Sequence, residues 1–348
     1  MPEIQKHSIP AGEVTYITLT NASGARVVLS SLGAGIVSVE VPDAAGRMAD
    51  VVVGYRDPAD YMADGPCAGK CPGRYANRIA RGHLEIDGTV HQLAINNGPN
   101  ALHGGPTGFQ NRIWTVEEVT DNKVVFAYTS ADGEEGYPGR LDVRATYIWN
   151  DADELILRFE ARTDRPTAVN LTNHAYWNLS GHDAGTALGH ILRLYASRWL
   201  PTDDTLVPTG ELARVAGTPM DFTEPKTLGR DIRADFPALK YGKGYDNCWA
   251  IDAYDGKGTA VLAARLEDPE SGRVLDVYTT QPGVQVYTGN WFEGSPRSKS
   301  GSEYHDYDAV AIECQAFPDS PNKPQFPGTI LRPGEKYDQT ITFRFSVK

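Results

Sequence analysis

The chain has 348 residues, with 33 basic against 45 acidic side chains and a formal net charge of −12, and its length allows one large all-β domain or two ordinary domains. This charge repels phosphate backbones and anionic lipid at long range, so no nucleic acid and no membrane is expected as a partner. The sequence begins without the basic start and apolar run of a signal peptide, and no apolar stretch reaches the ~18 residues of a membrane span, so we expect a cytoplasmic protein.

Alternating apolar and polar residues predict short β-strands along the whole chain. The period of two is clear at residues 25–29, 124–128, 155–159 and 340–345. Turn dipeptides separate such segments, and Asp87-Gly88 between two of them predicts a β-hairpin.

Helices are expected to be few, because no sustained helical face of about ten residues appears. The irregular stretch at residues 203–243 is where short helical turns are expected, around Asp231. No composition shift or fixed-period repeat divides the chain. We therefore expect an all-β fold, a large antiparallel β-sandwich, built as one domain over residues 1–348.

Two further patterns favour structural roles. Gly33-Ala34-Gly35 resembles the start of a dinucleotide fingerprint, but the third glycine is missing and the following residues read as a strand, which favours a bend or bulge. The cysteines form no Cys-x-x-Cys pair, so in a well-cored chain we expect free thiols at Cys67, Cys71, Cys248 and Cys314.

Polar residues in two loops are candidates for a binding site, although each is weakly specific alone. Asn77-Arg78 follows a glycine- and arginine-containing segment, and His103 lies in a loop rich in glycine and asparagine. The eight histidines show no zinc-like spacing, so no metal is expected, although His103 and His174 could meet in space.

The most informative segment is residues 173–179, which combines two amides with His174, Tyr176 and Trp177. Proton-exchanging groups beside flat apolar faces complement the surface of a sugar, although Trp177 is expected in the core. A second signal is Glu313, a carboxylate that directly follows the apolar run at residues 309–312. A carboxylate is seldom buried unpaired, and such local conflicts tend to mark functional sites. Together these segments predict a carbohydrate site.

Several motifs in consistent order resemble the aldose 1-epimerase family, also called galactose mutarotases, from about residue 10 to the end. The resemblance implies a galactose mutarotase-like β-supersandwich, no cofactor, and interconversion of the α and β anomers of a free hexose such as galactose or glucose. We expect a monosaccharide as partner, and a monomer or homodimer. The chain departs from the family at Pro72, Asn247 and Cys314. The matching motifs are residues 73–79, 102–105, 132–139, 173–179, 245–247, 281–290 and 313–315.

The resemblance assigns Glu313 as the catalytic base and His174 as the catalytic acid. Opening a pyranose ring requires removal of the proton from the anomeric hydroxyl and delivery of a proton to the ring oxygen, which a carboxylate and an imidazolium can do together. We therefore expect Glu313 to start ionised and His174 to start protonated. The resemblance also implies sugar-contacting positions at Asn77, Arg78, His103, Tyr176, Asp246 and Gln285.

Three other functions remain open from the sequence. A hexose-6-phosphate 1-epimerase would need a local cluster of basic side chains to meet the phosphate. A glycoside hydrolase could use Asp246 and Glu313 as its two carboxylates. A non-catalytic carbohydrate-binding protein would share the sandwich architecture and the aromatic surfaces.

Overall fold

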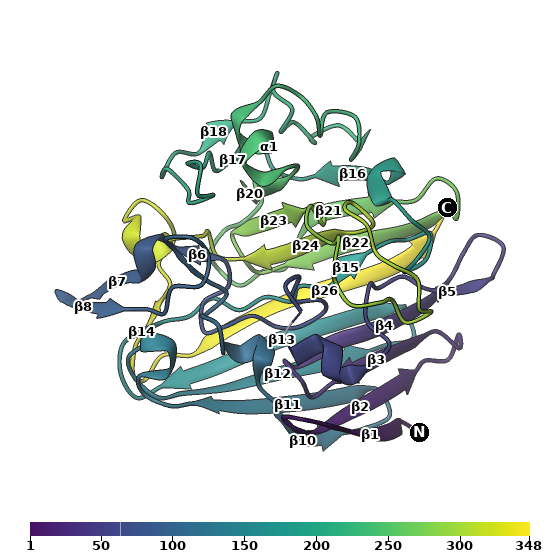
Figure 1. The fold of residues 1–348 in the computed structure, drawn as a ribbon, viewed down its shortest axis with the longest axis horizontal. Helices are drawn as coiled ribbons and strands as arrows, with labels where there is room; N and C mark the ends of the chain where they lie inside the picture. Colours follow the sequence, from purple (N-terminus) through teal and green to yellow (C-terminus); the bar gives the residue numbers. More distant parts are fainter. Residues whose placement is uncertain (63) are drawn as a thin grey trace.

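A computed structural model describes residues 1–62 and 64–348. The regular secondary structure of the described chain consists mostly of strands that pair antiparallel with their neighbours, as expected from the period-two patterns (Figure 1). The largest sheet has nine strands in the order β10 Thr115–Val119, β11 Lys123–Ser130, β12 Leu141–Trp149, β13 Glu154–Thr163, β26 Tyr337–Val347, β22 Arg273–Thr279, β21 Val261–Glu267, β16 Ile191–Leu194 and β19 Lys226–Thr227.

Two smaller sheets face this large one. A five-stranded sheet follows chain order, with β1 Glu3–Ile9, β2 Gly12–Thr20, β3 Arg26–Ser30, β4 Gly35–Pro42 and β5 Met48–Asp50. A six-stranded sheet has the order β15 Tyr176–Trp177, β24 Val310–Gln315, β23 Gly283–Tyr287, β20 Asp246–Ala250, β17 Arg198–Trp199 and β18 Ala213–Arg214.

Short paired strands and helical segments complete the described chain. The two-stranded sheets are β6 Arg78–Ile79 with β9 Ala101–Leu102, β7 His83–Ile86 with β8 Thr89–Gln92, and β14 Thr167–Ala168 with β25 Ile330–Leu331. One α-helix, α1, spans Pro237–Gly242. Segments of 3-10 helix lie at Pro58–Met62, Ala80–Gly82, Phe109–Asn111, Glu134–Gly136, Ala187–Gly189 and Ser320–Asn322.

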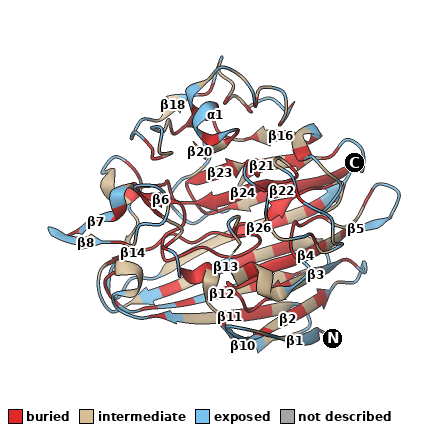
Figure 2. Ribbon diagram, viewed as in Figure 1, coloured by how far each residue is buried: buried red, intermediate tan, exposed pale blue. Residues whose placement is uncertain are grey.

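One hydrophobic core joins the three large sheets. Inward-facing residues of the nine-stranded sheet, such as Val143 and Leu157, belong to the same buried cluster as Val27 of the five-stranded sheet and Val286 and Ile312 of the six-stranded sheet. Figure 2 shows this burial along the central strands, with exposed residues at the β7–β8 hairpin. The expected sandwich is therefore confirmed, with the nine-stranded sheet as one layer and the two smaller sheets facing it.

Local expectations from the sequence are met at two turns. Asp87 and Gly88 both have positive φ between β7 and β8, as the two-residue hairpin turn requires. Gly33 has a φ of +62° between β3 and β4, and a Cβ there would lie 2.7 Å from the carbonyl oxygen of Gln110. The glycine-rich segment is therefore a tight bend between strands.

The helical expectation was misplaced by a few residues. Residues 231–233 form a turn, and the helix α1 begins at Pro237. A proline at the first helical position fits because its missing N–H would have no helical partner there. Within the described part of the chain, every helix is too short or too polar to cross a membrane.

Candidate active site

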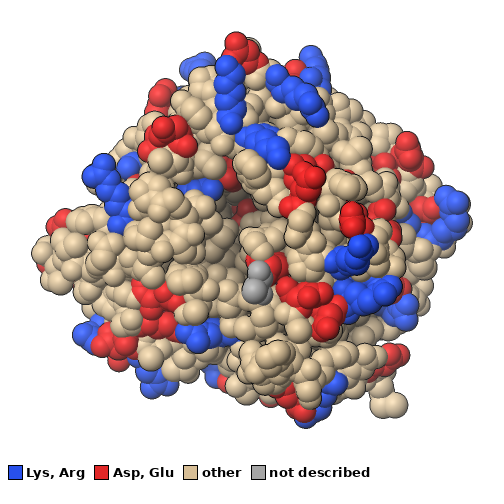
Figure 3. All heavy atoms as spheres, in the orientation of Figure 1, with Lys and Arg blue, Asp and Glu red and all other residues tan. Residues whose placement is uncertain are grey.

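A cleft with a volume of about 570 Å³ opens over the six-stranded sheet. It corresponds to the hollow near the centre of the face in Figure 3, where both acidic and basic side chains lie around the opening. The described residues that line it include seven of the eight positions expected from the sequence, and the exception is Gln285. The seven are Asn77, Arg78, His103, His174, Tyr176, Asp246 and Glu313.

Strand alternation explains why a carboxylate follows an apolar run at β24. Ile312 and Cys314 point into the hydrophobic core, so Glu313 between them points to the opposite face of the sheet, toward the cleft. Antiparallel pairing brings neighbours alongside it, because Gln285 of β23 lies directly opposite Glu313. Asp246 on β20 is one strand further, and its Oδ1 accepts a hydrogen bond of 2.6 Å from Gln285 Nε2.

His174 reaches the same place from the segment before β15. Its backbone pairs with residues 69–70: the N–H of His174 donates to the carbonyl of Lys70 at 2.9 Å, and the N–H of Gly69 donates to the carbonyl of His174 at 3.0 Å. The imidazole Nε2 lies 3.4 Å from Glu313 Oε1. The two predicted acid–base side chains therefore converge, although they are far apart in the sequence.

The loop residues form a second wall of the cleft. Asn77 and His103 both have positive φ, and the N–H of Asn77 donates to His103 Nδ1 at 3.1 Å. His103 also lies edge-on to His174, with ring centroids 5.3 Å apart, so these histidines do meet in space. Arg78 donates to Asn97 Oδ1 at 3.1 Å and to Asp246 Oδ2 at 3.3 Å. These contacts orient the guanidinium across the cleft.

The two aromatic residues of β15 point to opposite faces of the strand. Tyr176 lines the cleft, and its hydroxyl donates to the carbonyl of Pro66 at 2.9 Å. Trp177 is fully buried in the core, where its ring centroid lies 5.0 Å from that of Phe343. The expectation of a core role for Trp177 is confirmed.

Burial governs the proton affinities of the central pair. Glu313 is 2% exposed and His174 is 4% exposed. Burial lowers the pKa of His174 to about 4, although the negative charge of Asp246 acts in the opposite direction. Burial and the charge of Asp246 raise the pKa of Glu313 well above its usual value, while Arg78 lowers it. These shifts favour a neutral Glu313 beside a neutral His174, whereas the sequence analysis expected an ion pair.

Several polar atoms of the site have no hydrogen-bond partner within the described chain. They are Glu313 Oε2, Gln285 Oε1 and His174 Nδ1, all buried. An unpaired buried polar atom costs free energy unless a ligand or water satisfies it. The cleft therefore offers free hydrogen-bonding capacity to a polar ligand such as a sugar.

One group of side chains could also hold a metal ion. Ligand atoms of His103, His174 and Glu313 all lie within 4.8 Å of one another. Two imidazoles and a carboxylate suit a divalent transition metal. His103 would bind through Nε2, because its Nδ1 already accepts a hydrogen bond from Asn77.

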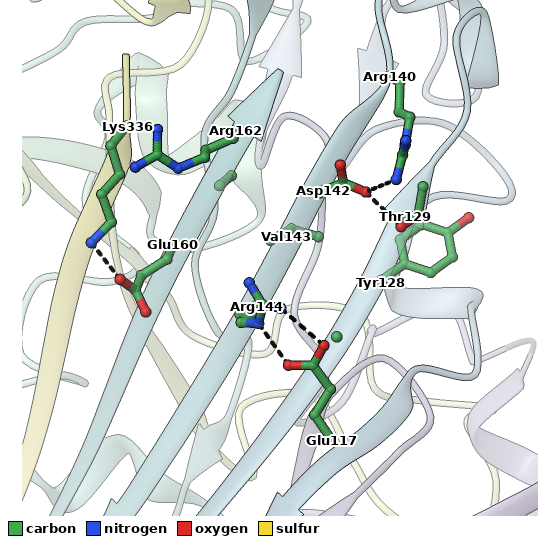
Figure 4. A pocket seen from close by; sticks show the side chains of 12 residues that line it. Glu117, Tyr128, Thr129, Arg140, Asp142, Val143, Arg144, Glu160, Arg162 and Lys336 are labelled. Carbon is green, nitrogen blue, oxygen red and sulfur yellow. Dashed lines mark hydrogen bonds and ion pairs between the residues drawn. The ribbon is translucent and has the colours of Figure 1, made fainter. Parts of the chain in front are cut away.

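A second hollow, of about 590 Å³, lies on the outer face of the nine-stranded sheet and differs in its chemistry (Figure 4). Its charged side chains largely pair with one another. The ion pairs are Arg144 with Glu117, Arg140 with Asp142 and Lys336 with Glu160. This pattern describes a solvated sheet face and offers less unpaired polar capacity than the cleft.

The sequence reasoning missed several residues that shape the cleft. Lys70 is buried and paired with the buried Asp64 at 2.5 Å, and it also donates to Asn111 Oδ1 at 3.1 Å. Lysine is usually exposed, so composition gives no signal for such a pair. Tyr241 and Trp291 also line the cleft and were not singled out. The departures Asn247 and Cys314 are buried and are not among the described residues that line the cavity.

Comparisons with known proteins place this chain among aldose 1-epimerases. The family model described as aldose 1-epimerase matches residues 15–344. The galactose mutarotase of Bos taurus is 44% identical over 322 residues, covering 92% of this chain and 91% of the relative. The aldose 1-epimerase of Escherichia coli strain K12 is 37% identical over 332 residues, covering 94% of each chain. A solved aldose epimerase homologue from C. elegans superimposes with a TM-score of 0.87 at 33% identity, covering 95% of this chain and 98% of that one.

Proposed function

The chain belongs to the aldose 1-epimerase family and is an isomerase of that class, and we propose that its cleft interconverts the α and β anomers of a free hexose such as galactose or glucose, with Glu313 and His174 as the acid–base pair. The observation that carries the assignment of roles is the 3.4 Å separation of Glu313 Oε1 and His174 Nε2 at the bottom of the cleft. Galactose is named by the matched mammalian relatives.

The proposed reaction moves two protons and breaks one ring bond. Glu313 takes the proton of the anomeric hydroxyl while His174 delivers a proton to the ring oxygen, so the bond between the anomeric carbon and the ring oxygen breaks and an aldehyde forms. Rotation about the adjoining carbon–carbon bond exposes the other face of the aldehyde. The ring then closes with the two proton transfers reversed, and both side chains return to their starting states.

This direction of transfer requires the single proton of the pair to lie on His174. Burial opposes that arrangement, but two neighbouring charges support it. Asp246 raises the pKa of His174, and Arg78 lowers the pKa of Glu313. A bound sugar would add hydrogen bonds to the carboxylate and stabilise its charged form further.

The remaining cleft residues are proposed to hold the sugar. Arg78 supplies fixed donors for hydroxyl or ring oxygens, and Asp246 accepts hydrogen bonds from sugar hydroxyls. Asn77 and His103 line the cleft from the loop side. Gln285 holds Asp246 in position through the hydrogen bond from its Nε2 to Asp246 Oδ1.

The test follows optical rotation of freshly dissolved α-galactose or α-glucose. We expect Glu313→Gln and His174→Asn each to lower kcat by about 10²- to 10⁴-fold, the usual size of a general acid or base contribution. A matched control is offered by His83 and Glu85, another His–Glu pair that is exposed on β7, with 3.9 Å between the ring nitrogen and the carboxylate. His83→Asn and Glu85→Gln should leave the rate unchanged.

The same assay separates the proposal from its competitors. Unchanged rates in both folded cleft variants would remove the assigned roles. A loss of activity in chelator that zinc restores would assign His103, His174 and Glu313 to a metal instead. Sugar binding without any acceleration of anomer exchange would indicate a non-catalytic binding protein.

A further inference from the structure

A buried ion pair lies behind the wall of the cleft that carries His174. Lys70 is 2% exposed, and its ammonium lies 2.5 Å from Asp64 Oδ1. The ammonium also donates to the carbonyl of Tyr61 and, at 3.1 Å, to Asn111 Oδ1, so each of its three N–H groups has an acceptor. Neither Lys70 nor Asp64 is among the described residues that line the cleft. The pair can therefore act on a bound sugar only through the chain around it.

The ion pair closes residues 64–70 into a compact segment, here called the 64–70 loop. The second carboxylate oxygen of Asp64, Oδ2, accepts a hydrogen bond of 2.6 Å from the N–H of Ala68 and one of 3.3 Å from the hydroxyl of Tyr55. Further along the loop, the N–H of Lys70 donates to the carbonyl of Cys67 at 3.3 Å. The first and last residues of the loop are thereby held together.

The 64–70 loop in turn holds the backbone of His174 on both sides. The N–H of His174 donates to the carbonyl of Lys70 at 2.9 Å, and the carbonyl of His174 accepts from the N–H of Gly69 at 3.0 Å. The side chain of Asn173 adds a hydrogen bond of 2.7 Å from its Nδ2 to the carbonyl of Gly69. The residue that fixes the end of the loop through its ammonium, Lys70, is thus the residue whose backbone receives His174.

The imidazole of His174 lacks the hydrogen bond that usually orients an acid–base histidine. Such a histidine is normally held through its second ring nitrogen, but Nδ1 of His174 is buried and has no partner within residues 1–62 and 64–348. The ring packs instead against that of Tyr176, with centroids 4.8 Å apart, and the hydroxyl of Tyr176 donates to the carbonyl of Pro66 at 2.9 Å. The place of the imidazole therefore depends on the 64–70 loop through both contacts.

We propose that Lys70, paired with Asp64, is a positioning residue for proton transfer by His174. This inference rests on the proposed anomer exchange. Removal of the ammonium would leave the carboxylate of Asp64 buried without its partner, so the 64–70 loop would have to rearrange. A displacement of about 1 Å between reacting groups can lower a rate by about 10²-fold. A shift of the loop therefore reaches the reaction through the imidazole, without any contact between Lys70 and the sugar.

The test replaces Lys70 by methionine, which keeps an unbranched apolar side chain and removes the charge. We expect Lys70→Met to lower kcat for α-galactose by about 10- to 100-fold. KM should change little, because the sugar contacts proposed for Arg78 and Asp246 come from β6 and β20 and not from the 64–70 loop. Optical rotation at a series of sugar concentrations separates kcat from KM.

Lys226 provides a matched control. It is also buried, at 7% exposed, and its ammonium donates to Asp231 Oδ2 and to the carbonyl of Pro219, both at 2.7 Å. It is not among the described residues that line the cleft. Lys226→Met breaks the same kind of pair, so it should lower the free energy of unfolding in urea and leave kcat unchanged. The comparison separates a loss of stability from a loss of positioning.

A double-mutant cycle then links Lys70 to His174. In the His174→Asn background the side chain that Lys70 positions is absent, so Lys70→Met should lower kcat no further. If the two substitutions act independently, so that their fold-losses in kcat multiply, the positioning role is overturned and the anomer exchange stands. An unchanged kcat in folded Lys70→Met overturns it as well.

Two further results are also decisive. If Lys70→Met does not fold, Asp64→Asn, which keeps the shape of the side chain and removes its charge, takes its place in the same cycle and is judged by the same two outcomes. If the wild type does not accelerate anomer exchange, the proposed function fails and the positioning role falls with it.

Discussion

At the residue scale, the proton that we propose Glu313 and His174 to share predicts the pH range of activity. Below about pH 4, the lowered pKa of His174, both groups are protonated and the base is lost. Above the raised pKa of Glu313 both are deprotonated and the acid is lost. We expect a bell-shaped profile of kcat/KM with its acidic limb near pH 4 and its basic limb displaced well above the usual carboxyl range.

The profile is measured from initial rates of anomer relaxation, corrected for the spontaneous reaction at each pH. Because the groups interact closely, the two limbs belong to the pair and not to one residue. In Glu313→Gln the base is absent, so the residual activity should lose the acidic limb and should fall above the pKa of His174, which alone must stay protonated. An acidic limb near pH 6.5, the ordinary pKa of histidine, would contradict the effect of burial on His174.

The raised pKa of Glu313 also predicts a cost in stability. The folded state binds the carboxyl proton of Glu313 more tightly than the unfolded state does. The protonated carboxyl therefore stabilises the fold fully below the pKa of the unfolded state, and this stabilisation is lost as pH rises through the pKa of the folded state. Glu313→Gln imitates the protonated form at every pH. We expect its free energy of unfolding in urea to exceed that of the wild type at pH 7, with the difference shrinking toward pH 4. An equal difference at both pH values would contradict the burial argument.

At the element scale, the loop that carries His103 requires a residue without a side chain at position 104. Gly104 has a φ of +80°, and a Cβ there would lie 1.9 Å from the carbonyl oxygen of Gly73. Gly104→Ala would push the two loops apart and disturb the bond from Asn77 to His103. Backbone strain alone typically costs about 1–3 kcal/mol. We expect the free energy of unfolding of Gly104→Ala to fall by more than this amount, and its KM to rise.

Gly88 provides the matched control for that substitution. Its φ is +78°, close to that of Gly104, but no atom lies within 4 Å of a Cβ built there. Gly88→Ala in the β7–β8 turn should therefore cost only the strain, and KM should not change. Both variants are measured by urea unfolding and by sugar kinetics. If both lose the same free energy of unfolding, the close contact between position 104 and the carbonyl of Gly73 does not matter for stability.

The elements could be foreseen where a local pattern determines them. Alternation predicted β13 and β26, and Asp87-Gly88 predicted the β7–β8 hairpin. The pairing of distant strands could not be foreseen, because side-chain periodicity indicates a strand but not its neighbour. The contact of Arg78 with Asp246 joins residues 168 positions apart.

The sequence predicted side chains that meet in the cleft, but it carries no information on how burial changes their charge states. A carboxylate after the apolar run at β24 and a histidine beside Tyr176 gave the central pair, and the family resemblance supplied the roles. The expected ion pair ignored burial, which sequence does not report. The Lys70–Asp64 pair behind His174 was missed for the same reason, since its formation depends on both groups being enclosed together.

At the scale of the whole molecule, charge bears on the choice between free and phosphorylated sugars. The net charge of −12 repels an anionic substrate at long range. Locally, the described lining of the cleft carries the carboxyl groups of Asp204, Asp246 and Glu313, while its one arginine, Arg78, is already paired with Asp246. A phosphate would therefore enter a negative field without a free cluster of basic side chains to bind it.

Glucose 6-phosphate should accordingly be a poorer substrate than glucose, by about tenfold or more in kcat/KM, which corresponds to about 1.4 kcal/mol of unfavourable interaction. Added salt screens long-range repulsion over a Debye length of about 10 Å at 0.1 M, so raising the ionic strength should increase kcat/KM for the phosphate ester and leave that for glucose unchanged. Rates for both sugars across a sodium chloride series provide the measurement. The opposite result would be a kcat/KM for the phosphate ester that exceeds that for glucose at low salt and falls as salt is added. Salt would then be screening an attraction between the cleft and the phosphate, and the chain would be assigned to hexose-6-phosphate epimerisation.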